Sequence, residues 1–143
     1  AWAETRGIAE ALDAPIPIFQ CPASFEPTAE HQETMRAFFG EADRGHFRFA
    51  WEPRGSWDDA EVETLCDDLD LIHCVDPFQS QTVTEDLAYF RLHGIEGYYH
   101  NYSEDELEQV RAWCEPFETA YVLFNNVSMW EDALRFREML GQY

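Results

Sequence analysis

The sequence predicts an α/β fold: about five β/α units of a TIM-type β/α barrel. Short apolar runs alternate with segments of helical periodicity, a pattern typical of parallel strands joined by right-handed crossovers. Five of these runs also stop on a polar residue. Because the active sites of such barrels collect at the carboxyl ends of the strands, the polar endings favour a barrel over an open doubly wound sheet.

The five apolar runs are the predicted strands. Strands that are buried on both faces read as near-continuous hydrophobic segments, and these runs have that character. They cover residues 16–19, 47–51, 71–75, 87–92 and 120–124, and the polar residues that end them are Gln20, Glu52, Asp76, His93, and Asn125 with Asn126. Since parallel strands all end on the same side, we expect these side chains to meet at one rim.

Apolar residues at helical spacing predict the helices between the strands. The inner faces are expected to hold, in chain order, Ile8, Ala9 and Leu12; Met35, Phe38 and Phe39; Val62, Leu65, Cys66 and Leu69; Leu107, Val110 and Trp113 or Cys114; and Leu134, Phe136 and Leu140. The expected boundary signals are Gly40 as a C-cap, Ser56 as a helix start, the capping boxes Ser103–Glu106 and Ser128–Glu131, and Gly141 after the last helix. Residues 77–86 are too few for a loop and a full crossover helix, so we expect irregular structure there.

Acidic residues dominate the composition. The 143 residues include 29 Asp and Glu and nine basic residues, all of them arginine, which gives a formal net charge of −20. Because salt screens such self-repulsion, we expect a cytoplasmic protein from a salt-accumulating organism. The absence of a basic stripe argues against a nucleic-acid partner, and no apolar run is long enough for a membrane span. Cys21, Cys66, Cys74 and Cys114 lack metal-type spacing and are expected to be reduced thiols.

Three strand-end residues are the predicted catalytic groups: Glu52, Asp76 and His93. Two carboxylates with an imidazole could move a proton or hold a divalent cation. No spacing such as HExxH is present, so a resident metal is the less favoured alternative and no cofactor is implied. A third interpretation is an ion-pair network with Arg91 and Arg54 that only fills the barrel mouth.

The predicted substrate-binding residues lie beside these groups. Period-two alternation places Arg91 on the same face of its strand as His93, and Arg54 follows Glu52 in a rigid turn; a guanidinium in either place could bind an anion. Two tyrosines of the segment 94–102 could stack on a ring, and three strand-end amides could orient a ligand. The full substrate-binding set is Gln20, Arg54, Arg91, Tyr98, Tyr102, Asn125 and Asn126.

Short segments at the strand ends resemble the DUF72 family, the YecE-like proteins. They are Phe19–Phe25, Ala50–Trp57, Val75–Pro77, Tyr89–Gly94, Tyr102–Ser103 and Phe124–Asn126, and they occur in family order over nearly the whole chain. The resemblance implies a TIM-type barrel of about eight strands. It implies no reaction, and the acidic, lysine-free composition is similar to that of a haloarchaeal member. Family members are longer, so the resemblance also implies that this chain corresponds to the carboxyl-terminal portion of the barrel and that it begins within the helix before the fourth strand.

Two functions follow as hypotheses. The first is an enzyme that acts on a small polar or anionic metabolite at the carboxyl-terminal face of the barrel. The second is a non-catalytic ligand-binding or assembly protein that uses the same pocket. If the chain is complete as it stands, five strands leave two unpaired edges, and we then expect a homo-oligomer that covers them.

Overall fold

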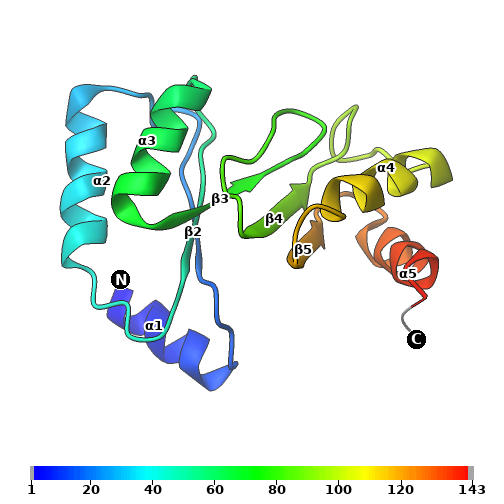
Figure 1. The fold of residues 1–143 in the computed structure, drawn as a ribbon, viewed down its shortest axis with the longest axis horizontal. Coiled ribbons are helices and arrows are strands. Elements are labelled where there is room, and N and C mark those ends of the chain that lie inside the picture. The colour runs from blue at the N-terminus through cyan, green and yellow to red at the C-terminus, as the bar shows by residue number, and fades with distance from the viewer. Residues whose placement is uncertain (1, 142–143) are drawn as a thin grey trace. The chain divides into compact units, whose positions relative to one another are not determined.

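The computed structural model describes residues 2–141, which fall into two compact units (Figure 1). Unit 1 ends at Cys74 and unit 2 begins at Val75. Both units alternate parallel strands with helices, so the predicted α/β class is confirmed. Within residues 2–141, no helix combines the length and the hydropathy that crossing a bilayer requires.

Unit 1 is built on three parallel strands with a helix before each of them. In chain order its elements are α1 (Trp2–Ala11), β1 (Ile18–Gln20), α2 (Ala29–Glu41), β2 (Phe49–Glu52), α3 (Asp59–Leu69) and β3 (Leu71–Val75). β2 pairs with β1 on one side and with β3 on the other. The register sets Gln20 opposite Glu52, so the predicted polar ends of these two strands are level.

Aromatic rings form much of the core of unit 1. Phe19 of β1 packs against Phe39 of α2 and Phe49 of β2, with ring centroids 5.2 and 4.9 Å away. The apolar face predicted for α1 is wrong in part, because Ile8 and Leu12 are exposed and Ala9 is buried. Trp2 anchors that helix instead: its ring packs against the rings of Phe19, Phe47 and Phe49.

Two predicted helix boundaries in unit 1 are wrong. Gly40 lies inside α2, and the C-cap is Ala42. Ser56 does not open α3, because its backbone amide and hydroxyl both donate to the carboxylate of Glu26. Asp58 caps α3 instead, in a capping box with Glu61. The buried face of α3 is as predicted.

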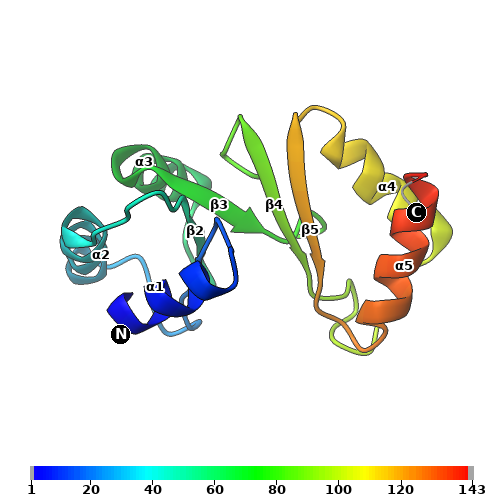
Figure 2. The same ribbon diagram turned by 90° about the horizontal axis from the view of Figure 1, so that it is seen from below.

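Unit 2 contains β4 (Leu87–Leu92), α4 (Glu104–Cys114), β5 (Thr119–Phe124) and α5 (Met129–Met139). β4 and β5 are parallel, and Leu92 lies opposite Phe124, so His93 and Asn125 leave the two strands at the same level. Figure 2 shows both helices on one side of this strand pair. Residues 77–86 are irregular, as predicted.

The core of unit 2 lies between the strand pair and the two helices. Leu92, Tyr102, Leu107, Val110 and Phe136 form its buried cluster. The capping box at Ser103 is confirmed, whereas the one at Ser128 is wrong: the Ser128 hydroxyl donates to Asn101. The predicted inner face of α5 is also wrong in one position, because Leu140 is exposed.

Candidate functional site

The ten predicted site residues divide between the units. Gln20, Glu52 and Arg54 belong to unit 1, and the other seven belong to unit 2. In each unit the predicted residues stand at or just beyond the carboxyl ends of parallel strands, which is the edge where α/β proteins bind ligands.

Glu52 is the buried polar group at the end of β2. Its carboxylate accepts a hydrogen bond from Arg54 Nη1 at 3.0 Å, and the thiol of Cys74 lies 3.9 Å from its second oxygen. Pro53 favours an extended backbone at Glu52, so the chain leaves the strand directly and bends at residues 55–56. Because the Arg54 side chain is 41% exposed, this ion pair joins a buried carboxylate to a cation that solvent reaches.

The loops that follow β1 and β2 are fastened together. Trp57 Nε1 donates to the carbonyl oxygen of Phe25 at 2.8 Å, and the rings of Phe25 and His31 stack 4.2 Å apart. Gly55 lies in the same contact: a Cβ there would come within 2.8 Å of the Phe25 oxygen. The two loops therefore form one rigid surface beside Gln20, which ends β1 with an exposed side chain.

Asp76 ties the start of the irregular segment in unit 2 to the end of β4. Its Oδ2 accepts the backbone amide of His93 at 2.9 Å, and its Oδ1 accepts that of Phe78 at 3.1 Å. Both carboxylate oxygens therefore bind backbone donors. Such charge-assisted bonds fix the position of the groups that donate them.

His93 and Asn125 are joined across the ends of β4 and β5. Asn125 Nδ2 lies 3.1 Å from His93 Nδ1, and the Asn125 backbone amide donates to the Leu92 oxygen at 2.8 Å. With the amide nitrogen as donor, Nδ1 accepts and the neutral imidazole carries its proton on Nε2. The structure thus brings together two of the predicted residues and gives the ring a defined orientation.

The turn after His93 needs glycine. Gly94 has a φ of +89°, and a Cβ there would overlap the carbonyl oxygen of Gly97. The Gly94 amide donates to the hydroxyl of Tyr102 at 2.8 Å. Tyr102 is 1% exposed, and burial raises the pKa of its hydroxyl. Tyr102, predicted to contact substrate, is therefore a core residue whose polar tip supports the turn beside His93.

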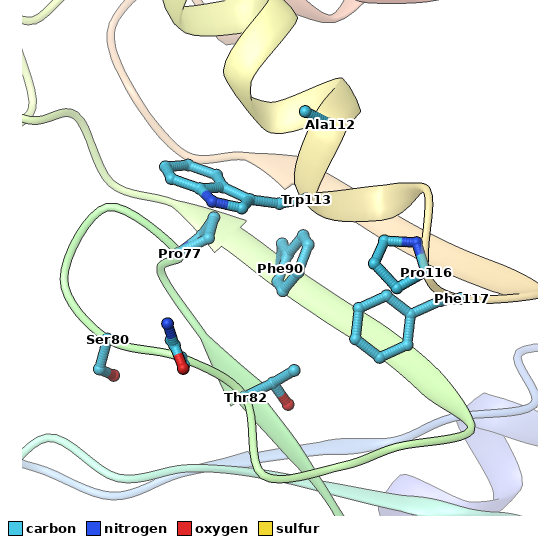
Figure 3. A pocket seen from close by; sticks show the side chains of 9 residues that line it. Pro77, Ser80, Thr82, Phe90, Ala112, Trp113, Pro116 and Phe117 are labelled. Atoms are coloured by element: carbon cyan, nitrogen blue, oxygen red, sulfur yellow. The ribbon is translucent and has the colours of Figure 1, made fainter.

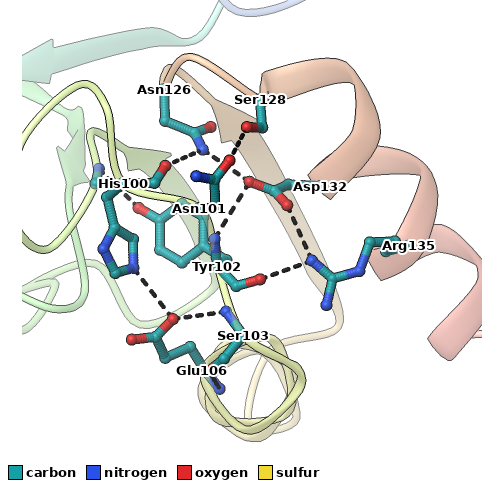
Figure 4. Close-up of polar contacts among 10 residues, drawn as sticks. His100, Asn101, Tyr102, Ser103, Glu106, Asn126, Ser128, Asp132 and Arg135 are labelled. Carbon is teal, nitrogen blue, oxygen red and sulfur yellow. Dashed lines mark hydrogen bonds and ion pairs between the residues drawn. The ribbon is translucent and has the colours of Figure 1, made fainter.

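A buried polar network lies behind this turn (Figure 4). Asp132 of α5 accepts hydrogen bonds from Asn126 Nδ2 at 2.7 Å, from the backbone amide of Tyr102 at 3.4 Å, and from Arg135 at 3.1 Å. Asn126 Nδ2 also donates to the carbonyl oxygen of His100 at 2.8 Å. Asn126, predicted to orient a ligand, is fully buried, and both hydrogens of its amide nitrogen hold the scaffold.

One backbone and one side-chain hydrogen bond also join the loop after β4 to the loop after β5. The Val127 amide donates to the carbonyl oxygen of Tyr98 at 2.7 Å, and Ser128 bonds to Asn101. Tyr98 itself is 51% exposed, with its ring edge-on to that of Tyr99. Of the two predicted tyrosines, Tyr98 is thus the one that presents its ring to solvent.

Arg91 is the remaining predicted residue of unit 2. It lies near the end of β4, partly buried and opposite Leu123 of β5. Within residues 2–141, no group of three or more His, Cys, Asp and Glu side chains is arranged to hold a metal ion.

Sequence reasoning missed Asp132 and Arg135. A carboxylate in the first turn of a helix is typical of an exposed, dipole-stabilising residue, so Asp132 gave no signal of burial. The spacing of Asp132 and Arg135, three residues apart on α5, is the pattern that could have suggested an ion pair.

Parallel strands, intervening helices and polar strand ends define this chain as part of a β/α-barrel-type protein. Residues 8–143 match the family described as "Protein of unknown function DUF72", and the chain belongs to that family.

Two solved structures have the same fold. A DUF72 family protein from Thermotoga maritima is 22% identical, with a TM-score of 0.76, and one from Enterococcus faecalis is 19% identical, with a TM-score of 0.77. Each likeness covers 99% of this chain and 65% of the other, so this chain spans about two thirds of the length of these relatives. No curated protein gives a significant match to this chain.

Proposed function

We propose that the strand ends of unit 2 bind a small polar or anionic metabolite and that His93 acts on it as a neutral acid through Nε2–H. The observation that carries the proposal is the bond between Asn125 and His93 Nδ1. It selects the tautomer that carries the proton on Nε2 and occupies the lone pair of Nδ1, so neither ring nitrogen accepts a proton while this bond is kept. The neutral ring then offers Nε2–H as a donor of fixed orientation, which can stabilise negative charge that develops on a ligand oxygen.

The neighbouring residues take supporting roles in this proposal. Asp76 positions His93 through its backbone amide, so we assign it a positioning role and not that of the base. Asn125 fixes the tautomer, Arg91 supplies positive charge on β4, and Tyr98 offers an exposed ring on which a sugar or another flat ligand could stack.

Unit 1 has a polar strand end of its own, which we treat independently of unit 2. Glu52 is a buried carboxylate that accepts a hydrogen bond from the partly exposed Arg54, and we assign Glu52 the role of a base and Arg54 that of an anion-binding group there. The net charge of −20 supports a cytoplasmic protein of a salt-accumulating cell that binds no nucleic acid.

A non-catalytic binding protein is the second candidate. Its support is that both oxygens of Asp76 accept backbone amides, while Tyr102 and Asn126 are buried in the scaffold. Asp76, Tyr102 and Asn126 can therefore shape a pocket without any of them performing acid–base chemistry.

The test separates these two functions. The chain, held in roughly 1 M salt to screen its charge, is titrated with a panel of neutral sugars and small phosphorylated metabolites while binding and turnover are measured together. His93→Gln should retain binding of a hit and lose turnover. Saturable binding without turnover in the unmodified chain would select the second candidate, and binding and turnover that survive His93→Ala would contradict the assignment of the site.

A further inference from the structure

Unit 2 has a concave feature that the proposed function does not use. It is a pocket of about 290 Å³ between the irregular segment 77–86, the outward face of β4 and the end of α4 (Figure 3). We refer to it as the β4–α4 pocket. Its walls include Phe90 of β4, Trp113 of α4 and Phe117, which follows that helix.

The irregular segment explains why the pocket exists. A crossover helix at residues 77–86 would cover this part of β4, but the segment has only ten residues and forms no helix. The ring of Phe90 packs edge-on against that of Phe117, with centroids 6.3 Å apart. Phe90 itself is buried, so it forms the floor while the two rings from the α4 side form a wall.

The chemistry of the lining is unusual for this chain. None of the nine lining residues carries a charge, although the chain as a whole has a net charge of −20. Opposite the aromatic wall, Ser80, Gln81 and Thr82 supply two hydroxyls and an amide. Apolar walls with a few polar groups on one side are typical of small-molecule sites, whose volumes begin at about 300 Å³.

We propose that the β4–α4 pocket binds a neutral, planar aromatic molecule that carries a single hydrogen-bonding group, of the phenol or indole class. The rings of Phe90, Trp113 and Phe117 would contact the faces and edges of the ligand ring. The polar group would meet the hydroxyls or the amide of the segment 80–82. The acidic chain repels anions, and the pocket offers neither a cation nor a carboxylate that would pair with a charged ligand, so the ligand is uncharged.

The size of the pocket distinguishes this ligand from a macromolecule. A volume of about 290 Å³ holds one or two rings, whereas a docked helix or strand needs an extended groove. The polar residues of the pocket stand opposite its aromatic wall, so a ligand would bind in one orientation. The proposal is independent of the activity proposed for His93.

The experiment uses the chain with phenol and indole as probes, and with benzoate as a charged comparison. Amide resonances of residues 80–82, 112–115 and 117 are followed by heteronuclear NMR during each titration. Phenol and indole should shift these resonances saturably, and benzoate should not. Equal binding of benzoate, or no shifts with either neutral probe while the spectrum stays folded, would overturn the proposal.

A variant that fills the pocket provides the matched control. Ala112 lines the pocket from an exposed position of α4, so Ala112→Phe should occupy it without disturbing the core. Indole binding should weaken by at least about tenfold. Gln109→Phe, at an exposed position of the same helix outside the lining, should leave the affinity unchanged.

Other occupants of the β4–α4 pocket would give different experimental results. Resonances of the pocket that shift on concentration of the chain alone, without any probe, would show that a second copy fills the pocket. Binding of a proline-rich peptide in preference to indole would show a peptide groove. Either result would overturn the proposal.

Discussion

The imidazole of His93 and the side-chain amide of Asn125 meet across adjacent strand ends, with 3.1 Å between Nδ1 and Nδ2. The two residues are 32 positions apart in the sequence, and the parallel register of β4 and β5 brings them level. Asn125 thereby selects the tautomer of the neutral His93 ring.

The first prediction concerns this tautomer. Nitrogen chemical shifts of the His93 ring, measured above the pH at which it is protonated, should show the Nε2–H form. Asn125→Ala should give a mixture of both tautomers, because the donor to Nδ1 is gone. Gln109→Ala, at an exposed position of α4, is the control and should leave the ring unchanged. A dominant Nδ1–H form in the unmodified chain would contradict the assigned bond.

The second prediction concerns the buried carboxylate of α5. Asp132→Ala leaves the amide of Asn126 and the backbone amide of Tyr102 without their acceptor. Each buried group left unsatisfied costs about 1–3 kcal/mol, so the free energy of unfolding should fall by roughly 2–4 kcal/mol in a urea titration. Glu131→Ala, at the exposed neighbouring position, should change it by less than about 0.5 kcal/mol.

The third prediction compares two glycines of unit 1. Gly40 lies exposed in α2 with open space around its Cα, so Gly40→Ala should stabilise unit 1 by up to about 1 kcal/mol. Gly55→Ala should destabilise it, because the new Cβ would press on the backbone oxygen of Phe25. Thermal unfolding of the two variants tests the contrast, and a stabilising Gly55→Ala would show that the two loops separate easily.

The fourth prediction follows from His73, a buried residue of β3. Burial lowers the pKa of His73 from 6.5 to about 4. Between these values the unfolded chain binds a proton that the folded chain does not, so the stabilisation is full above pH 6.5 and is lost as the pH falls towards 4. The whole effect is about 3 kcal/mol.

Urea titrations across this pH range measure the effect directly. His73→Gln should flatten the fall in stability, because glutamine binds no proton. His46→Gln, at an exposed position, should leave the fall as steep as in the unmodified chain. An unchanged slope in His73→Gln would place the source of the pH dependence among the carboxylates.

The strands could be predicted closely because their apolar runs are continuous and end on polar residues. The buried face of α3 could be predicted because its apolar residues repeat at helical spacing; they are Val62, Leu65, Cys66 and Leu69. The start of α3 could not be predicted, since Ser56 is held by Glu26, which is 30 residues away in the chain. Contacts of that range leave no local pattern.

The location of the candidate site could be predicted from the sequence, whereas the roles of its residues could be predicted only in part. Alternation and strand ends identified His93 and Asn125, which do contact each other. Asp132 accepts hydrogen bonds from the Asn126 side chain and the Tyr102 backbone amide, and a first-turn aspartate is usually exposed, so this structural role had no signal in the sequence. The role of Glu52, which belongs to unit 1, stays a prediction.

The amide of Val127 bonded to the oxygen of Tyr98 has a thermodynamic consequence. Ordering either loop restricts the other, so a ligand that immobilises the exposed ring of Tyr98 also immobilises the segment that carries Asn125. Both segments then lose their conformational entropy when the first ligand binds. Ligands that reach one segment should therefore bind with positive cooperativity toward ligands that reach the other.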